Sequence, residues 1–177
     1  MKRILLFTAI FFASAMAYAQ TSTTTTSTSN GLSASSDVNA IYFNKAWGTG
    51  SHIVESLDVY DWGSTKANHF YLEGHEQLAT TAGFTIYAGG VAVEPDLTKV
   101  LKNINYSSDN IKVKAYASLG NGIPTSGSSH ISALVGGVVS YRASSSLTWN
   151  ALQANWIRFG AQNGASISTG LAFIFGK

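Results

Sequence analysis

Residues 166–177, SISTGLAFIFGK, close the chain and decide its fold. Large apolar side chains recur there at every second position, with one interruption, at Ile167, Leu171, Phe173 and Phe175. Thr169 is the interruption, and most of the residues between them are small. Because side chains alternate across a β-strand, this period of two predicts a strand with one face of large apolar side chains and one face of mostly small side chains.

The same alternation runs through the chain from Ala40 onward, in short segments separated by Gly, Ser, Asn and Asp. This texture is typical of strands joined by turns. The expected strands are 40–48, 51–61, 69–78, 84–93, 111–119, 131–142, 147–159 and 166–175. In 147–159 we expect a β-bulge, because Leu147 and Trp149 align with Gln153 and Asn155 and so change face along the strand.

Strands with alternating apolar and polar residues form either a soluble β-sandwich with an apolar core or a transmembrane β-barrel with an apolar outer surface. Four features favour the barrel: long strands, small residues on the inward face, an even strand count and aromatic residues near the strand ends. The residues expected to form aromatic girdles are Trp47, Trp62, Tyr87, Tyr141, Trp149 and Trp156. The sequence therefore predicts an all-β, antiparallel up-and-down transmembrane β-barrel of about eight strands.

Polar residues on the inward faces are expected to meet in a narrow lumen, where charges must pair. The candidates for this polar lumen network are Tyr71, Glu73, His75, Lys112, Lys114, Arg142 and Arg158. An ion-pair network that plugs the barrel is the expected arrangement. A substrate-conducting pore is not expected with eight strands.

The start of the chain predicts export. Lys2 and Arg3 precede an apolar run that is too short for a permanent anchor, and Ala17 and Ala19 form a small-x-small cleavage site. We expect a signal peptide over 1–19, a flexible Ser/Thr-rich leader over 20–39 and a barrel domain over 40–177. Within the 94–110 connection, PDLTKVLKNI has the spacing of a short amphipathic helix, and a loop packed on the barrel rim is the alternative.

These residues resemble small bacterial outer-membrane β-barrel proteins over roughly 40–177. The resemblance implies a cell outer membrane location, outer-membrane lipid and the barrel assembly machinery as partners, and a last strand that the machinery reads. The implied assembly signal is Leu171, Phe173 and Phe175, although Gly176 and Lys177 follow where the family usually stops. The resemblance also places both termini in the periplasm, so that 49–50, 79–83, 120–130 and 160–165 are the outward loops.

Composition excludes several function classes. With no cysteine, 11% charged residues and a net charge of +2, the chain has neither a thiolate site nor the footprint of a nucleic-acid-binding protein. His69, Glu73 and His75 share a face, but a third metal ligand is not evident, so we expect no metal, cofactor or catalytic residue. Ser129 and His130 are adjacent, so in a strand their side chains would point to opposite faces, which argues against a nucleophile–base pair. The expected function is a non-enzymatic outer-membrane barrel with a structural or surface-interaction role, and a soluble exported β-sandwich binding module is the alternative.

Overall fold

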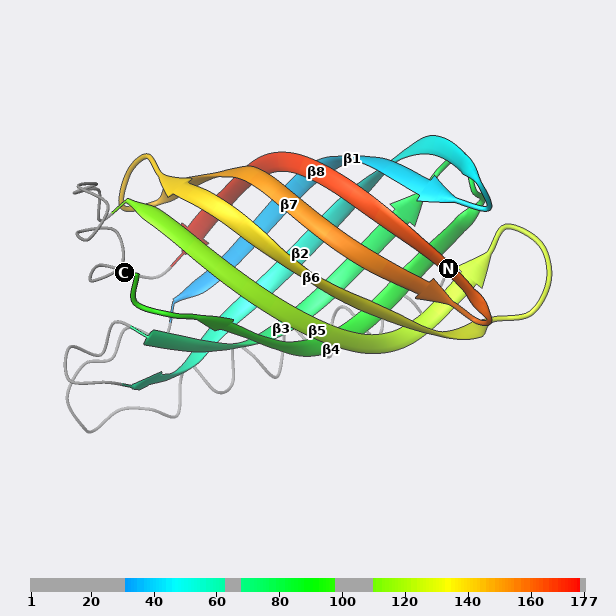
Figure 1. Ribbon diagram of the computed structural model, residues 1–177. Helices are drawn as coiled ribbons and strands as arrows, with labels where there is room; N and C mark the ends of the chain where they lie inside the picture. Colours follow the sequence, from blue (N-terminus) through cyan, green and yellow to red (C-terminus); the bar gives the residue numbers. More distant parts are fainter. Residues whose placement is uncertain (1–30, 63–67, 98–109, 176–177) are drawn as a thin grey trace.

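The computed structural model describes residues 31–62, 68–97 and 110–175, and all regular structure in these ranges is β-sheet (Figure 1). Within them, no helix is long and apolar enough to cross a membrane. The strands are β1 Leu32–Phe43, β2 Ala46–Trp62, β3 Asn68–Ala79, β4 Phe84–Glu94, β5 Ile111–Pro124, β6 His130–Arg142, β7 Leu147–Phe159 and β8 Gln162–Phe175. The expected signal peptide and most of the segment expected to be helical lie outside the described residues.

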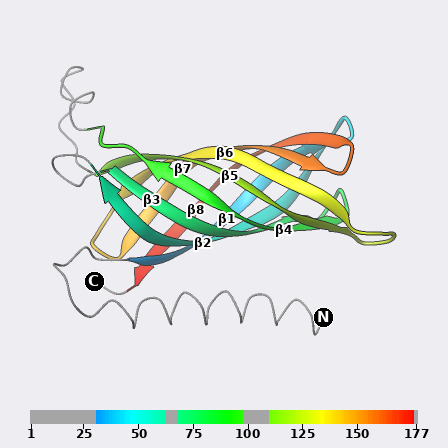
Figure 2. The same cartoon turned by 90° about the horizontal axis from the view of Figure 1, so that it is seen from below.

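The eight strands form one closed barrel in which each strand pairs antiparallel with its neighbours in sequence. Pairing of β8 with β1 closes the sheet, as Figures 1 and 2 show from two directions. Following paired residues once around the barrel from Leu32 leads back to β1 at Tyr42, ten residues further along the strand. With ordinary strand spacing and rise, this shear tilts the strands by about 40°. The predicted antiparallel barrel is confirmed, and the two-sheet sandwich is wrong.

The barrel has two distinct ends. The terminal end holds the start of β1 and the end of β8, together with the ends of β2, β4 and β6 and the starts of β3, β5 and β7. The hairpin end holds the short turns 44–45, 80–83, 125–129 and 160–161. The strands on either side of the 94–110 connection, β4 and β5, therefore end and begin at the same end of the barrel as the start of β1 and the end of β8, as expected.

The first hairpin differs from the prediction. Its turn is Asn44–Lys45, where both residues have positive φ (51° and 64°), as a tight type I′ hairpin turn requires. The predicted turn at 49–50 lies inside β2 instead. Gly50 is there for space rather than for turning, since a Cβ would lie 2.0 Å from the carbonyl oxygen of Leu78 on the neighbouring strand.

The boundary predicted between leader and barrel at residue 40 is also wrong, because β1 begins at Leu32. Residues 33–39 contain too few large apolar side chains to suggest a buried strand. Their small inward side chains nevertheless suit a narrow lumen, and β1 closes the barrel by pairing along its whole length with β8.

Two bulges set which side chains point inward. Between β6 and β7 the pairing passes from Val139–Leu152 to Ser140–Asn150, so Ala151 is the extra residue and the predicted bulge is confirmed. A second shift, between Asp58 and Tyr60, explains why the faces of β2 are mixed in the sequence.

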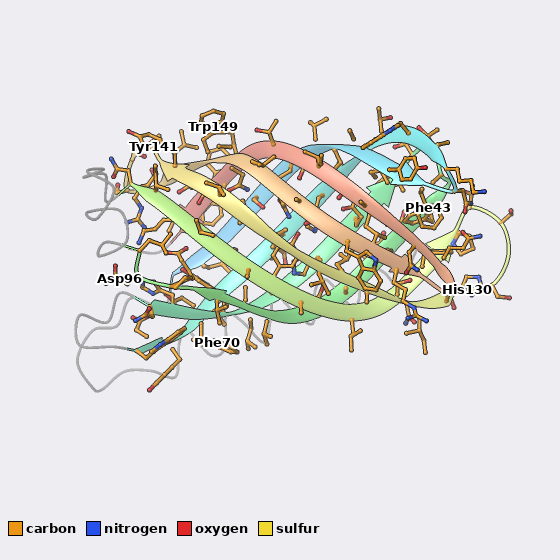
Figure 3. All side chains as sticks on the ribbon, viewed as in Figure 1. Phe43, Phe70, Asp96, His130, Tyr141 and Trp149 are labelled. Carbon is orange, nitrogen blue, oxygen red and sulfur yellow. The ribbon has the colours of Figure 1, made fainter. Side chains whose placement is uncertain are left out.

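The outer wall is largely apolar, although Glu55 on β2 and Glu76 on β3 lie on neighbouring outward positions. Among its large residues, Ile131, Val38 and Leu119 are 79%, 74% and 70% exposed. Aromatic side chains gather toward its ends: Tyr42 contacts Trp47 beside the first hairpin turn, with ring centroids 5.3 Å apart. At the terminal end, Tyr141 pairs with Trp149 across β6 and β7 (Figure 3), and Tyr60 stacks on Trp62. The molecule is thus apolar outside and largely polar inside, the reverse of a soluble protein.

Candidate functional site in the barrel lumen

Glu73 is the centre of the polar part of the lumen. Its side chain is fully buried, and its Oε1 accepts hydrogen bonds from the Lys114 ammonium and from Ser56 Oγ, the latter at 2.7 Å. Lys114 also donates to Ser56 Oγ at 3.2 Å. These residues come from β2, β3 and β5, and the barrel curvature points all three inward. A buried carboxylate needs such partners, since an unpaired buried charge is strongly destabilising.

Two histidines and Gln153 continue the polar contacts from Glu73 across the lumen. His75 Nε2 lies 3.2 Å from Glu73 Oε2, and His75 Nδ1 lies 3.1 Å from His52 Nε2. The side-chain amide of Gln153 donates to His52 Nδ1 at 2.8 Å. Because Gln153 donates, His52 carries its proton on Nε2, and His75 then carries its proton on the nitrogen that faces Glu73. This assignment gives hydrogen bonds from Gln153 to His52 and from His52 to His75, and it directs the other ring nitrogen of His75 toward the Glu73 carboxylate.

The other amide hydrogen of Gln153 extends the network to the opposite wall. It reaches Tyr116 Oη, whose hydroxyl donates to Asn155 Oδ1. Asn155 in turn donates to Ser166 Oγ at 3.1 Å. The network therefore connects β2, β3, β5, β7 and β8 through side chains, in addition to the backbone pairing.

Two further buried pairs involve β1, a strand that the sequence did not lead us to expect in full. Asn150 donates to Asp37 Oδ1 at 3.0 Å, and Asn39 donates to Gln77 Oε1 at 3.0 Å. The alternation of Asp37, Asn39 and Ile41 was the signal that could have identified β1, but it stands beside a Ser/Thr-rich stretch that reads as disordered.

The lumen toward the hairpin end is apolar, and this differs from the predicted polar plug. Phe43, Phe84 and Phe159 pack as a cluster of three rings, with centroids 4.6–6.3 Å apart. This apolar plug also contains the buried residues Ile41, Ala79, Ile86, Leu134 and Ile157. The barrel is therefore closed by hydrophobic packing at the hairpin end and by polar contacts further in.

A cavity of about 40 Å³ lies among the polar residues, lined in part by Ser33, Ser56, Glu73 and Lys114. A water molecule needs about 10–15 Å³ by this measure, so the cavity has room for a few waters. The space suits hydration of the Glu73–Lys114 pair and is too small for a channel along the barrel.

Of the predicted lumen residues, all but Arg158 lie on inward positions of their strands. Tyr71, Glu73, His75, Lys112 and Lys114 lie on inward positions, and Lys112 pairs with Glu94 at 3.4 Å near the terminal end. Arg142, half-buried, ends β6 at the same end. Arg158 is misplaced by the prediction: the bulge at Ala151 turns it outward, where its Nε donates to the Gly160 carbonyl at 3.1 Å.

The two chemical alternatives considered from the sequence are not supported by the geometry. His69 does not join Glu73 and His75, because its Nδ1 contacts Asp58 and Asp61 at the terminal end. Ser129 and His130 are both exposed, and the His130 ring packs edge-on against Phe159, with centroids 5.3 Å apart. Among the described residues no carboxylate forms an ion pair with His130, so a relay for nucleophilic catalysis is not assembled there.

Comparison with known proteins gives similarity in fold alone. No protein-family profile matches the sequence, and no curated protein matches it. The crystal structure of Ail, the attachment invasion locus protein of Yersinia pestis, in complex with the heparin analogue sucrose octasulfate, superposes with a TM-score of 0.50 at 8% identity, over 82% of this chain and 97% of that one. Neisserial surface protein A gives a TM-score of 0.49 at 14% identity, over 82% of this chain and 96% of that one. A de novo designed transmembrane β-barrel gives 0.40 at 12% identity, over 85% of this chain and all of that one. The chain thus has the closed, antiparallel, eight-stranded fold of small outer-membrane β-barrels, with no specific member of that class identified.

Proposed function

We propose that this chain is a non-enzymatic barrel of a Gram-negative outer membrane, exported by a cleavable signal peptide over residues 1–19. Its role is structural or one of surface interaction, and its lumen is closed. The single observation that carries the proposal is the inverted distribution of side chains, with an exposed apolar wall around a buried polar lumen. In water this wall would be a large aggregation-prone surface. In a bilayer the same apolar side chains would contact lipid acyl chains.

The aromatic residues support the same placement. Tyr42 and Trp47 lie toward one end of the wall, and Tyr141 and Trp149 lie toward the other. Aromatic side chains favour the two membrane–water interfaces, so these positions mark the edges of the spanned layer. The terminal end then faces the periplasm, and the hairpin end faces outward.

The closed lumen favours a role that does not involve transport. The apolar plug blocks the hairpin end, and the polar network leaves a cavity of about 40 Å³. The outward turns are only two to five residues long. This favours a role exerted by the barrel wall itself over recognition by long surface loops.

Assembly is expected to depend on β8. Leu171, Phe173 and Phe175 point outward on this strand and are about half exposed. We propose that the barrel assembly machinery reads this edge of β8 before it pairs with β1.

Membrane fractionation with a heat-shift gel tests the proposal. We expect the chain in the membrane pellet, released by detergent, with faster migration before boiling than after it. A chain that stays soluble without detergent and shows no mobility change on boiling would overturn the proposal.

A further inference from the structure

A second cluster of polar side chains lies apart from the lumen network, at the terminal end of the barrel. His69 Nδ1 lies 2.9 Å from Asp58 Oδ2 and 2.6 Å from Asp61 Oδ1. One ligand atom from each of the three residues lies within 4.8 Å of the others. The network around Glu73 uses none of these residues.

The β2 bulge creates this cluster. Asp58 and Asp61 are three positions apart, so in a regular strand they would point to opposite faces. The register shift between Asp58 and Tyr60 adds one residue and turns both carboxylates toward the same side. Asp61 pairs directly with His69 on β3, which brings the imidazole between them.

The cluster holds two carboxylates and one imidazole. Among the ion pairs of the described residues, His69 is the one partner of both carboxylates, and the nearby Lys112 pairs with Glu94. Asp58 is only 8% exposed, and its Oδ1 is buried without a hydrogen-bond partner. Asp37 Oδ2 and Glu73 Oε2 are also buried without a hydrogen-bond partner, but only at Asp58 does the unpartnered oxygen belong to a cluster of potential metal ligands within the described residues, where a bound ion would satisfy it.

We propose that Asp58, Asp61 and His69 bind a divalent transition-metal ion of the Zn²⁺ class, which clips the end of β2 to the start of β3. One imidazole nitrogen with two carboxylates is a ligand set for Zn²⁺, whereas Mg²⁺ and Ca²⁺ favour oxygen alone. The partly exposed side of His69 leaves a fourth position for water.

The geometry needs only a small adjustment. Zinc holds nitrogen and oxygen ligands at about 2.0–2.2 Å, which separates tetrahedral ligand atoms by about 3.3–3.5 Å. The present separation of 2.9 Å must therefore widen by about 0.5 Å and that of 2.6 Å by about 0.8 Å. His69 must offer the Nδ1 lone pair, so its ring proton moves to Nε2 or leaves to solvent when the ion binds.

The test uses the full chain without an affinity tag, folded in detergent, stripped with a chelator and titrated with Zn²⁺ by calorimetry. Two isosteric variants, Asp61→Asn and His69→Gln, remove one ligand each. Glu76→Gln, on the outward face of β3, and His130→Gln, at the hairpin end, are matched controls. Heat-shift gels confirm that each variant is folded.

We expect one Zn²⁺ per chain and a rise in melting temperature when it binds. Each ligand variant should weaken binding at least as much as loss of an outer-shell partner does, about 10–100-fold. The two controls should stay within about twofold, and excess Mg²⁺ or Ca²⁺ should not displace the ion.

Co²⁺ provides a readout on the wild-type chain alone, should either variant fail to fold. A stoichiometric visible absorption that Zn²⁺ displaces is expected from cobalt held by nitrogen and oxygen ligands. The absence of that signal, or equal weakening of Zn²⁺ binding in the ligand variants and the controls, would overturn the proposal.

Discussion

Replacing Glu73 by Ala removes the common acceptor of the lumen network. Lys114 and Ser56 both lose their hydrogen bond to the carboxylate, and His75 loses the group that its Nε2 faces. Lys114 is left in a lumen where its side chain is only 18% exposed. The change therefore strands a cation rather than simply deleting one contact.

The expected loss follows from that burial. Removing one partner of a buried ion pair costs about 3–5 kcal/mol, because the remaining charge is uncompensated. Lys114 keeps a bond to Ser56 Oγ at 3.2 Å and partial access to the neighbouring cavity. We therefore expect the lower end of the range, about 3 kcal/mol.

Urea unfolding titrations in lipid vesicles measure this free energy. Glu76→Ala is the matched control: Glu76 lies on the same strand, faces outward and accepts only a 3.3 Å hydrogen bond from Tyr87, so a loss under about 1 kcal/mol is expected. Adding Lys114→Met to Glu73→Ala should recover part of the stability, since no charge is then stranded. An unchanged unfolding midpoint for Glu73→Ala, or an equal loss for both glutamates, would refute the reasoning.

Three further changes test other parts of the structure. Leu171 faces outward nearer the middle of the wall, and Arg at this position should reduce the free energy of folding into vesicles by about 2–4 kcal/mol. Arg at Phe175, near the edge of the wall, should reduce it by about 0–1 kcal/mol. A larger loss at Phe175 would count against a membrane-spanning wall. Phe159→Ala opens the apolar plug and should lower the unfolding free energy by about 3–5 kcal/mol, measured in urea, and a loss under about 1 would mean that the three rings do not form a packed core. Deleting Ala151 removes the extra residue and joins Asn150, which faces inward, directly to Leu152, which faces outward, so both halves of β7 keep their faces and the heat-shifted species should persist. Deleting Ala154, in the regular part of the strand, should abolish that species, because one half of β7 would then change face; the opposite pair of results would contradict the assigned register.

Much of the fold could be predicted from alternation alone. A period of two separates the inward from the outward face, so Tyr71, Glu73 and His75 were expected on one face, which they share in β3. The bulge in β7 was also predictable, because the polar and apolar phases change over a few residues there. These are local properties, and a strand carries them in its own sequence.

The missed features depend on more than one strand. His52 stood beside the turn predicted at 49–50 and was not assigned to the lumen, but the turn at Asn44–Lys45 lengthens β2 and places His52 well inside the barrel, where it is buried. The face of Arg158 depends on where the extra residue of the bulge lies. The sequence does not locate that residue, so Arg158 was assigned to the lumen.

The apolar plug was missed for a similar reason. Alternation tells which face a residue occupies, but not its level along the barrel axis. The shear of the sheet brings Ile41, Ile86 and Ile157 from distant segments to one layer. Each looks like an isolated apolar residue on an inward face until the register between all eight strands is known.

The central claim is that the outer wall faces lipid, and depth measurements along β7 test it most directly. The chain has no cysteine, so Ala154→Cys and Arg158→Cys each provide a unique labelling site. Ala154 faces outward between Trp149 and Trp156, whereas Arg158 lies beyond Trp156 at the hairpin end. In vesicles, a fluorophore at position 154 should be quenched by lipids brominated deep in the acyl chains and protected from aqueous iodide, and a fluorophore at position 158 should show the opposite. Equal iodide quenching at both positions, with no effect of brominated lipid, would contradict the membrane-spanning barrel.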